Sequence, residues 1–139
     1  MTRNILNKKL LLFLCCFFLV VSISAQNFIV SDLNCQGLEE YKIAQLKNEL
    51  LGAKVVMTTY DSSIKVAFTD NMSNKTELIY DRSSQDKNIY IAKELLPNGN
   101  IVYTLTLSIM INYISSATLQ AKRLNDDSHR IITYTLKRD

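Results

Sequence analysis

Apolar and polar residues alternate with a period of two from Ala53 to the end of the chain. Such alternation is typical of β-strands that bury one face and expose the other to water. The alternation and the turn-forming residues between its runs predict seven strands, at 53–60, 64–70, 76–82, 88–95, 101–114, 117–124 and 129–138. Residues 28–33 are a candidate for an eighth strand.

Three of these runs also predict which side chains are buried. Their apolar faces hold Ile64, Val66 and Phe68 in the second run, Ile89, Ile91 and Leu95 with Lys93 in the fourth, and Ile101, Tyr103, Leu105, Leu107, Ile109, Ile111 and Tyr113 in the fifth. A strand as long as 101–114 must coil or bend. The pair Ser115-Ser116 is the predicted position of that bend.

Short connections join the predicted strands, and Asn98-Gly99 after Pro97 is a strong hairpin signal. A parallel pair of strands would need a connection of about a dozen residues or more, so the strands are expected to form an antiparallel meander. Such a sheet has two unpaired edges unless it closes on itself. We therefore expect one mainly β domain, either a curled sheet or a small up-and-down barrel.

One helix is predicted near residues 37–51, before the strands begin. On a helical wheel Ile43, Leu46 and Leu50 lie on one side, and Gly52 then supplies a C-terminal stop. The apolar face is narrow and Lys47 interrupts it, with Ala44 and Leu51 on its flank. This pattern favours a helix that covers a sheet edge or a barrel mouth.

The first 25 residues have the pattern of a secretory signal peptide. Basic residues at 3, 8 and 9 precede an unbroken apolar run, Leu10–Val21, which is followed by the small residues of 22–25. Cleavage after Ala25 would release a single domain, 26–139, into the periplasm or outside the cell, with membrane contact only during export. The sequence Ser24-Ala25-Gln26 resembles the end of leaders in exported bacterial proteins.

Charge and cysteine content both change when this leader is set aside. It holds three of the 16 basic residues and none of the 13 acidic ones, so residues 26–139 carry no net charge. A neutral domain without a basic cluster argues against nucleic acid as a partner. Cys35 is the single cysteine left after Cys15 and Cys16, so an internal disulfide is excluded and the thiol is either buried, paired with another chain or reactive.

Catalytic and metal-binding patterns are weak in this sequence. The densest polar group is Asp126, Asp127 and His129, and a mobile hairpin turn is the favoured interpretation over a metal site. His129 is the one histidine, far in sequence from Cys35. The sequence therefore indicates no enzyme, no metal and no cofactor.

Tyrosines supply the candidate binding residues, because all seven lie after the leader and there is no tryptophan. Those at 80, 90, 103, 113 and 134 fall on predicted strands, where a ring can fill a barrel and leave its hydroxyl for a partner. On the last strand Arg130, Ile132, Tyr134, Leu136 and Arg138 share a face. The candidate ligand-binding residues are Tyr103, Tyr113, Arg130 and Tyr134; alternatively, Ile132, Tyr134 and Leu136 are simply core and both arginines emerge at the strand ends.

The order of a short helix, Leu51-Gly52 and a meander resembles that of lipocalin-like secreted domains. Arg130 and Arg138 are similar to the arginine on the closing strand of that family. The glycine-x-tryptophan motif of the family would place tryptophan at Lys54, where this chain has lysine. The resemblance is one of architecture, and no ligand is taken from it.

Two functions remain open on the sequence alone. One is a non-catalytic exported protein that binds a small apolar or amphipathic ligand, which requires a cavity inside the barrel. The other is a structural or protein-interaction module with a filled core and no small-molecule ligand. The sequence leaves the oligomeric state open.

Overall fold

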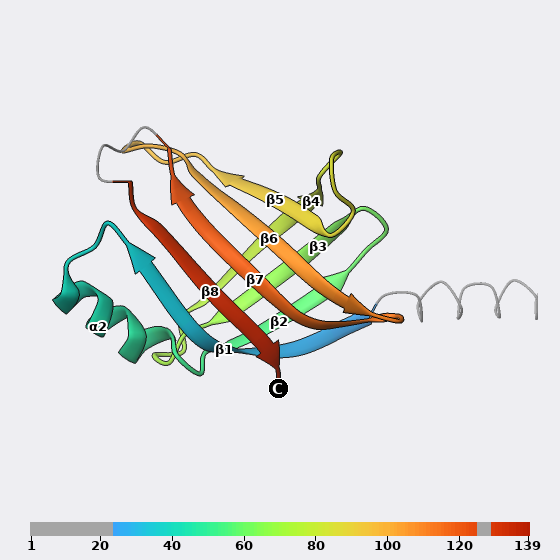
Figure 1. Cartoon of the computed structure of the whole chain (residues 1–139), viewed down its shortest axis with the longest axis horizontal. Coiled ribbons are helices and arrows are strands. Elements are labelled where there is room, and N and C mark those ends of the chain that lie inside the picture. Colours follow the sequence, from blue (N-terminus) through green and yellow to red (C-terminus); the bar gives the residue numbers. More distant parts are fainter. Residues whose placement is uncertain (1–23, 125–128) are drawn as a thin grey trace, which may run out of the picture.

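The computed structural model describes residues 24–124 and 129–139, which form eight strands and one helix (Figure 1). In chain order these are β1 (Ser24–Gln36), α2 (Glu40–Leu50), β2 (Lys54–Thr59), β3 (Ser63–Thr69), β4 (Lys75–Arg82), β5 (Ile89–Glu94), β6 (Ile101–Met110), β7 (Tyr113–Arg123) and β8 (Ile131–Arg138). The mainly β fold predicted from the alternation is confirmed, and residues 28–33 do belong to an eighth strand.

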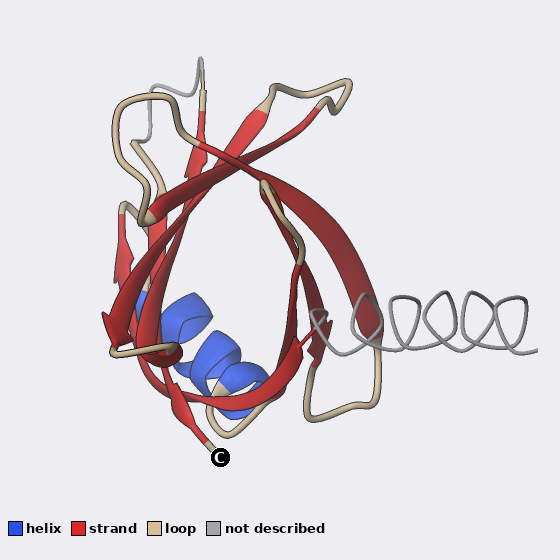
Figure 2. Ribbon diagram, turned by 90° about the vertical axis from the view of Figure 1, so that its right-hand side faces the viewer, coloured by secondary structure: helices blue, strands red, loops and turns tan. Residues whose placement is uncertain are grey.

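The sheet closes into a barrel (Figure 2). Each strand pairs antiparallel with the next, and β8 returns to pair with β1. The first strand makes this closure possible because it is 13 residues long. Residues 24–29 pair with β2, and residues 28–36 pair with β8, with a bulge between Val30 and Asp32. This closed antiparallel barrel is compatible with the lipocalin-like architecture.

The barrel has two different ends. The packed end carries the β2–β3, β4–β5 and β6–β7 connections, and apolar side chains fill its interior. Phe28, Met57, Ile64 and Leu105 there are fully buried, with no exposed surface. Burying each such side chain stabilises the fold by about 1.5–3 kcal/mol.

The open end carries α2, the β3–β4 and β5–β6 connections, the end of β7 and the start of β8. Its wall is incomplete, because β4 and β5 pair only at Asp81↔Ile91 and Arg82↔Tyr90, both toward the packed end. The stretch 75–80 of β4 therefore has no described partner on β5. The barrel wall splits along this line.

Helix α2 lies across the open end and is only lightly packed. None of its eleven residues, all of them described, is buried. Asn71, in the turn after β3, ties down its C-terminus by donating side-chain hydrogen bonds to the carbonyls of Asn48 and Leu51, both 2.9 Å. Gly52 follows at φ +80°, which confirms the predicted stop. No helix in the described part of the chain is long and apolar enough to span a bilayer.

The predicted long strand 101–114 is wrong, because the chain reverses inside it. The turn is at Ile111-Asn112, and Met110 pairs with Tyr113 across it. The bend predicted at Ser115-Ser116 is instead part of β7. Ile111 adopts a φ of +56°, a conformation that β-branched residues rarely take. An isoleucine at this position therefore does not signal a turn. The β6–β7 register shifts between Ser108 and Ile109, and Ile109 and Ile111, which were predicted on the buried face, are 49% and 96% exposed.

The buried face predicted for the fourth run is also wrong. In β5 the buried side chains are Tyr90 and Ala92, and Leu95 beyond the strand is 78% exposed. Glu94 shares the inward face with Tyr90 and Ala92 because side chains alternate along a strand. The large Ile89 and Ile91 face outward because closure of the barrel, and not their hydropathy, sets the parity of this strand.

Candidate functional site

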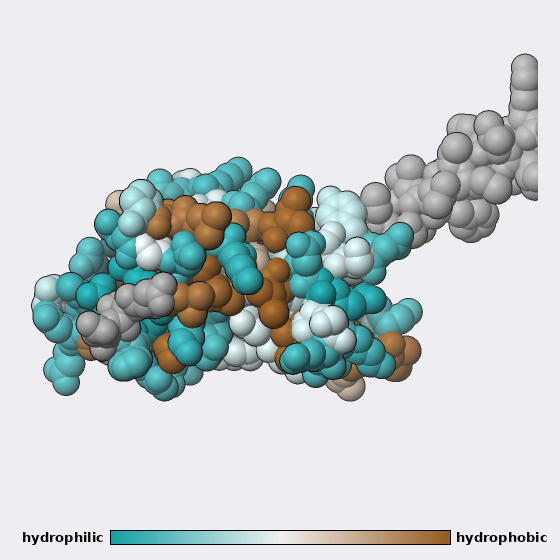
Figure 3. All heavy atoms as spheres, turned by 90° about the horizontal axis from the view of Figure 1, so that it is seen from above, coloured by the Kyte–Doolittle hydropathy of each residue, from teal (hydrophilic) through white to brown (hydrophobic). Residues whose placement is uncertain are grey.

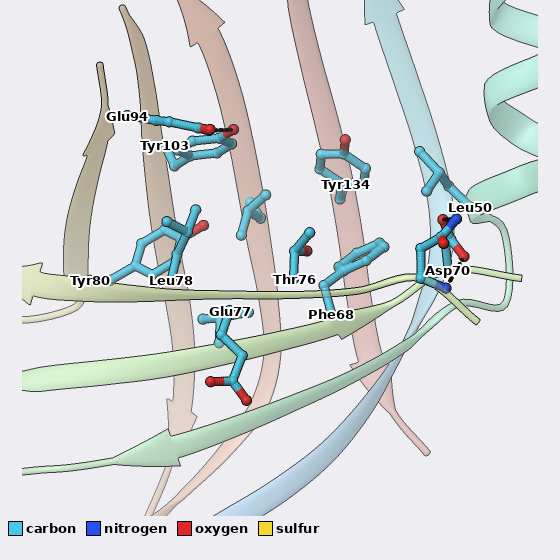
Figure 4. A pocket seen from close by; sticks show the side chains of 13 residues that line it. Leu50, Phe68, Asp70, Thr76, Glu77, Leu78, Tyr80, Glu94, Tyr103 and Tyr134 are labelled. Carbon is cyan, nitrogen blue, oxygen red and sulfur yellow. Dashed lines mark hydrogen bonds between the residues drawn. The ribbon is translucent and has the colours of Figure 1, made fainter. Parts of the chain in front are cut away.

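A cavity of about 450 Å³ lies inside the barrel at the open end (Figure 4). Apolar side chains from three strands form much of its wall: Val66 and Phe68 of β3, Leu78 of β4 and Leu119 of β7. Leu50, the last residue of α2, lines it from the helix side. An apolar wall with a few polar groups is the usual composition of a small-molecule site.

Three tyrosines line this cavity from different strands: Tyr80 of β4, Tyr103 of β6 and Tyr134 of β8. Tyr80 packs edge-on against Tyr103, with ring centroids 6.4 Å apart, and Tyr134 packs edge-on against Phe68 at 5.9 Å. Such contacts fix the orientation of the rings. The structure gives the hydroxyls of Tyr80 and Tyr134 no hydrogen bond to any described residue.

Glu94 supplies a charge inside the cavity. The hydroxyl of Tyr103 donates a hydrogen bond of 2.7 Å to the Oε2 atom of Glu94, and both side chains line the cavity (Figure 4). A hydrogen bond to a carboxylate is short and roughly twice as strong as one between neutral groups. The pair therefore forms a fixed polar patch beside the apolar side chains of the wall.

Burial in the cavity makes ionisation of these phenols unfavourable. It raises the pKa of Tyr80 well above its ordinary range, and nearby Tyr103 and Tyr134 add to the shift. Burial also raises the pKa of Tyr103, which the hydrogen bond to Glu94 and the negative charge of Glu94 raise further. The pKa of Tyr134 is raised by burial and, to a smaller extent, by Cys35. All three therefore act as neutral hydrogen-bonding groups at physiological pH.

Asp70 lies at the rim of the cavity, in the turn between β3 and β4. Its carboxylate accepts hydrogen bonds from the backbone N–H groups of Asn74 and Met72, at 2.8 and 2.9 Å, and from the Asn74 side chain. The bond from the Asn74 backbone is the main reason that the pKa of Asp70 is lowered; burial opposes it, and the bonds from the Asn74 side chain and the Met72 backbone lower the pKa further. Asp70 therefore holds the turn and keeps a negative charge at the rim.

A second depression, of about 370 Å³, separates α2 from the start of β8. Lys42 and Leu46 line it from the helix, and Arg130 and Ile132 line it from the other side. Cys35 is opposite Ile132 in the β1–β8 register and is a half-buried free thiol. Burial raises the pKa of this thiol, and the nearby charge of Lys47 partly offsets the effect.

The four candidate binding residues do not form one site. Tyr103 and Tyr134 both line the main cavity, whereas Arg130 lines the second depression. Tyr113 lies at the packed end, where the guanidinium of Arg138 is 5.0 Å from the centre of its ring. The inward face expected for the last strand does hold Tyr134 and the buried Leu136.

Sequence reasoning missed Tyr80 and Glu94 as parts of the site. Tyr80 was placed correctly on a strand, and its position two residues from Leu78 was a usable signal of a shared inward face. Glu94 had no such signal, because its strand carries larger apolar residues on the opposite face.

The described residues contain no group of three or more His, Cys, Asp or Glu side chains that could hold a metal ion. Asp126 and Asp127 lie outside the described residues, as do residues 1–23 of the predicted leader. His129, two residues after Asp127, is exposed, and its backbone has a φ of +48°.

Some large apolar side chains also reach the outer surface. Figure 3 shows apolar residues gathered on the face seen from above Figure 1, among mostly hydrophilic ones. The most exposed apolar side chains in the described chain include Ile111, Leu95, Met72 and Ile79.

Comparisons with protein-family models, with curated proteins and with solved structures found no match.

Proposed function

We propose that this chain is a non-catalytic exported protein that binds one small apolar or amphipathic molecule inside its barrel. The observation that carries the proposal is the contrast between a packed end with fully buried side chains and an open end with a cavity of about 450 Å³. A module with a filled core would have no use for such a cavity. We extend the resemblance with lipocalin-like domains from the architecture to this binding function.

Access to the cavity supports the same proposal. The wall is split where β4 leaves β5, and α2 covers the open end without burying any of its own residues. A lightly packed cover can move at small energetic cost because little apolar surface must be exposed. A ligand could therefore enter without unfolding of the packed end.

Export remains part of the proposal through the predicted leader. Intact mass of the protein recovered from outside the cytoplasm should correspond to a chain that begins at Gln26. Recovery of the whole 139-residue chain in the membrane would contradict both the export and the cysteine argument that depends on it.

The alternative of an interaction module also has one specific observation in its favour. The β6–β7 hairpin projects Ile109, Met110 and Ile111 from the packed end, with 49%, 55% and 96% of their surfaces exposed. Exposed apolar side chains of this kind are a common feature of protein-binding surfaces. Stable dimerisation or partner binding that depends on this hairpin, with no ligand in the cavity, would favour the alternative.

Tryptophan scanning offers a direct test because the chain has no tryptophan of its own. Leu78→Trp places the reporter in the cavity wall, and Ile79→Trp places it on the outer face of the same strand, where Ile79 is 62% exposed. We expect the neutral probe 10-bromodecan-1-ol, whose bromine quenches only on contact, to quench Leu78→Trp at low micromolar concentration. Quenching of Ile79→Trp should be weaker because its ring points away from the cavity and cannot contact the bound probe.

Native mass spectrometry of the unaltered protein, purified without detergent, complements this test. A releasable non-covalent adduct would support the binding function and identify the ligand class. Equal quenching of the two variants, together with a clean apo mass and no saturable probe binding, would contradict it.

A further inference from the structure

We infer that the cavity prefers a cationic amphiphile, an apolar body that carries an amine, and that Glu94 is the residue that receives the positive charge. This inference rests on the proposed binding function and adds the charge of the ligand to it. Its starting point is the position of Glu94, which shares the inward face of β5 with the buried Tyr90 and Ala92.

The charges around the cavity all have the same sign. Its charged lining residues are Asp70, Glu77 and Glu94, and no lysine or arginine lines it within the described chain. Glu77 points away from the Glu94–Tyr103 pair in Figure 4, and Asp70 is engaged in its own turn. Glu94 is thus the carboxylate that a bound molecule would meet inside.

Glu94 has a hydrogen-bond donor but no positive partner. Its described contacts comprise the bond from Tyr103 and no ion pair. Ile101 of β6 pairs with Glu94 of β5 on one side and with Arg123 of β7 on the other. Arg123 is therefore the basic residue that lies level with Glu94, two strands away. The Nε atom of Arg123 is buried against Gly99, 3.8 Å from the position of a Cβ there, and makes no hydrogen bond. The charge of Glu94 is therefore available to a ligand.

The tyrosines around Glu94 suit an ammonium group as well. Tyr80 is 2% exposed, lines the cavity and has a hydroxyl without a described hydrogen-bond partner, so it can accept a hydrogen bond from a ligand N–H. Tyrosine ring faces also attract cations. Val66, Phe68 and Leu119 supply apolar wall for the rest of the molecule.

An anionic ligand would fit this environment poorly. A carboxylate placed beside Glu94 would suffer like-charge repulsion in a partly dehydrated space, where Coulomb interactions are stronger than in water. Lys42, Glu49 and Arg130 are the charged residues of the separate depression beneath α2, whereas every charged residue that lines the main cavity is acidic.

Three probes of equal chain length separate these cases: decylamine, decanol and decanoate. Each is titrated by calorimetry, below its micelle-forming concentration, into the whole protein after its native mass shows that any co-purified molecule has been extracted. We expect decylamine to bind about tenfold more tightly than either other probe, and the difference to shrink at high salt. This comparison on the unaltered protein needs no variant to fold.

Glu94→Gln then removes the charge and keeps the shape of the side chain. We expect it to weaken decylamine binding about tenfold and to leave decanol binding unchanged. Asp81→Asn, which removes an exposed charge from the outer face of β4, is the matched control and should move neither affinity.

The possible failures are distinguishable. Binding of all three probes with decanoate equal to or tighter than decylamine overturns the charge preference and leaves the binding function standing. A preference for decylamine that survives Glu94→Gln shows that Glu94 is not the receiving group. Absence of binding by every probe overturns the binding function and this inference with it.

Discussion

The two ends of this barrel are built from the same eight strands and yet reach opposite states of packing. At the packed end, side chains such as Met57, Ile64 and Leu105 belong to one buried core cluster and have no exposed surface. At the open end, the split between β4 and β5 and a lightly packed helix leave a cavity of about 450 Å³. One end therefore supplies most of the fully buried apolar surface, whereas the other keeps an accessible cavity.

The largest expected effect is at the packed end. Leu105→Ala should lower the free energy of unfolding by about 2–5 kcal/mol, because it removes a fully buried side chain and leaves a void. Leu78→Ala, its counterpart in the cavity wall, is only half-buried and should cost about 1 kcal/mol or less. Urea denaturation of both variants measures the difference, and equal losses would remove the distinction between the ends.

Alkaline pH should act mainly through the open end. The folded protein raises the pKa values of Tyr80, Tyr103 and Tyr134 above the ordinary tyrosine value of about 10, so it retains these protons longer than the unfolded chain. Their contribution to stability is complete below about pH 10 and is lost as pH rises through the raised values. Thermal melting from pH 8 upward, with phenolate absorbance followed in parallel, tests this expectation.

Tyr103→Phe is the control for that pH dependence, because it removes one of the three phenols. Its stability should decline less steeply above about pH 10 than that of the unaltered protein. An unchanged slope would show that the Tyr103 phenol does not ionise with the expected difference between folded and unfolded chains.

The Tyr103–Glu94 hydrogen bond gives a smaller effect at neutral pH. Tyr103→Phe should cost about 1 kcal/mol, since the donor to Glu94 is lost while water at the open end can partly replace it. A double-mutant cycle with Glu94→Gln, measured by urea denaturation, should show coupling between the two side chains. Strict additivity would mean that the bond contributes nothing to stability.

The smallest effect is expected at the hairpin tip of the packed end. Ile111→Asn should stabilise the fold by about 0.5 kcal/mol, because asparagine tolerates the φ of +56° and the exposed isoleucine packs against little. Gly52→Ala at the open end, where φ is +80°, should have the opposite sign and cost about 1 kcal/mol. Melting temperatures of the two variants check both signs, and loss of stability in Ile111→Asn would contradict this account.

The sequence predicted the type of residue that lines the candidate site, but it did not predict correctly which residues line it. Tyr103 and Tyr134 could be named because aromatic residues on an inward strand face are natural cavity walls. Tyr113 and Arg130 could not be excluded from sequence, because their distance from the cavity depends on where each strand begins and on which end of the barrel stays open.

The antiparallel meander, the helix with its stop at Gly52 and nearly all of the strand positions could be predicted from the sequence, because they depend on local alternation and turn chemistry. The turn at Ile111, the inward direction of Glu94 and the cavity became visible only in the folded chain. The last two depend on how the strands pair around the closed barrel, because the register of each pair fixes which face of a strand points inward. In β5 the pairing of the barrel and the local hydropathy favour opposite faces. The pairing sets the outcome, because exchanging the two faces of β5 would shift its hydrogen-bonded register with β4 and β6.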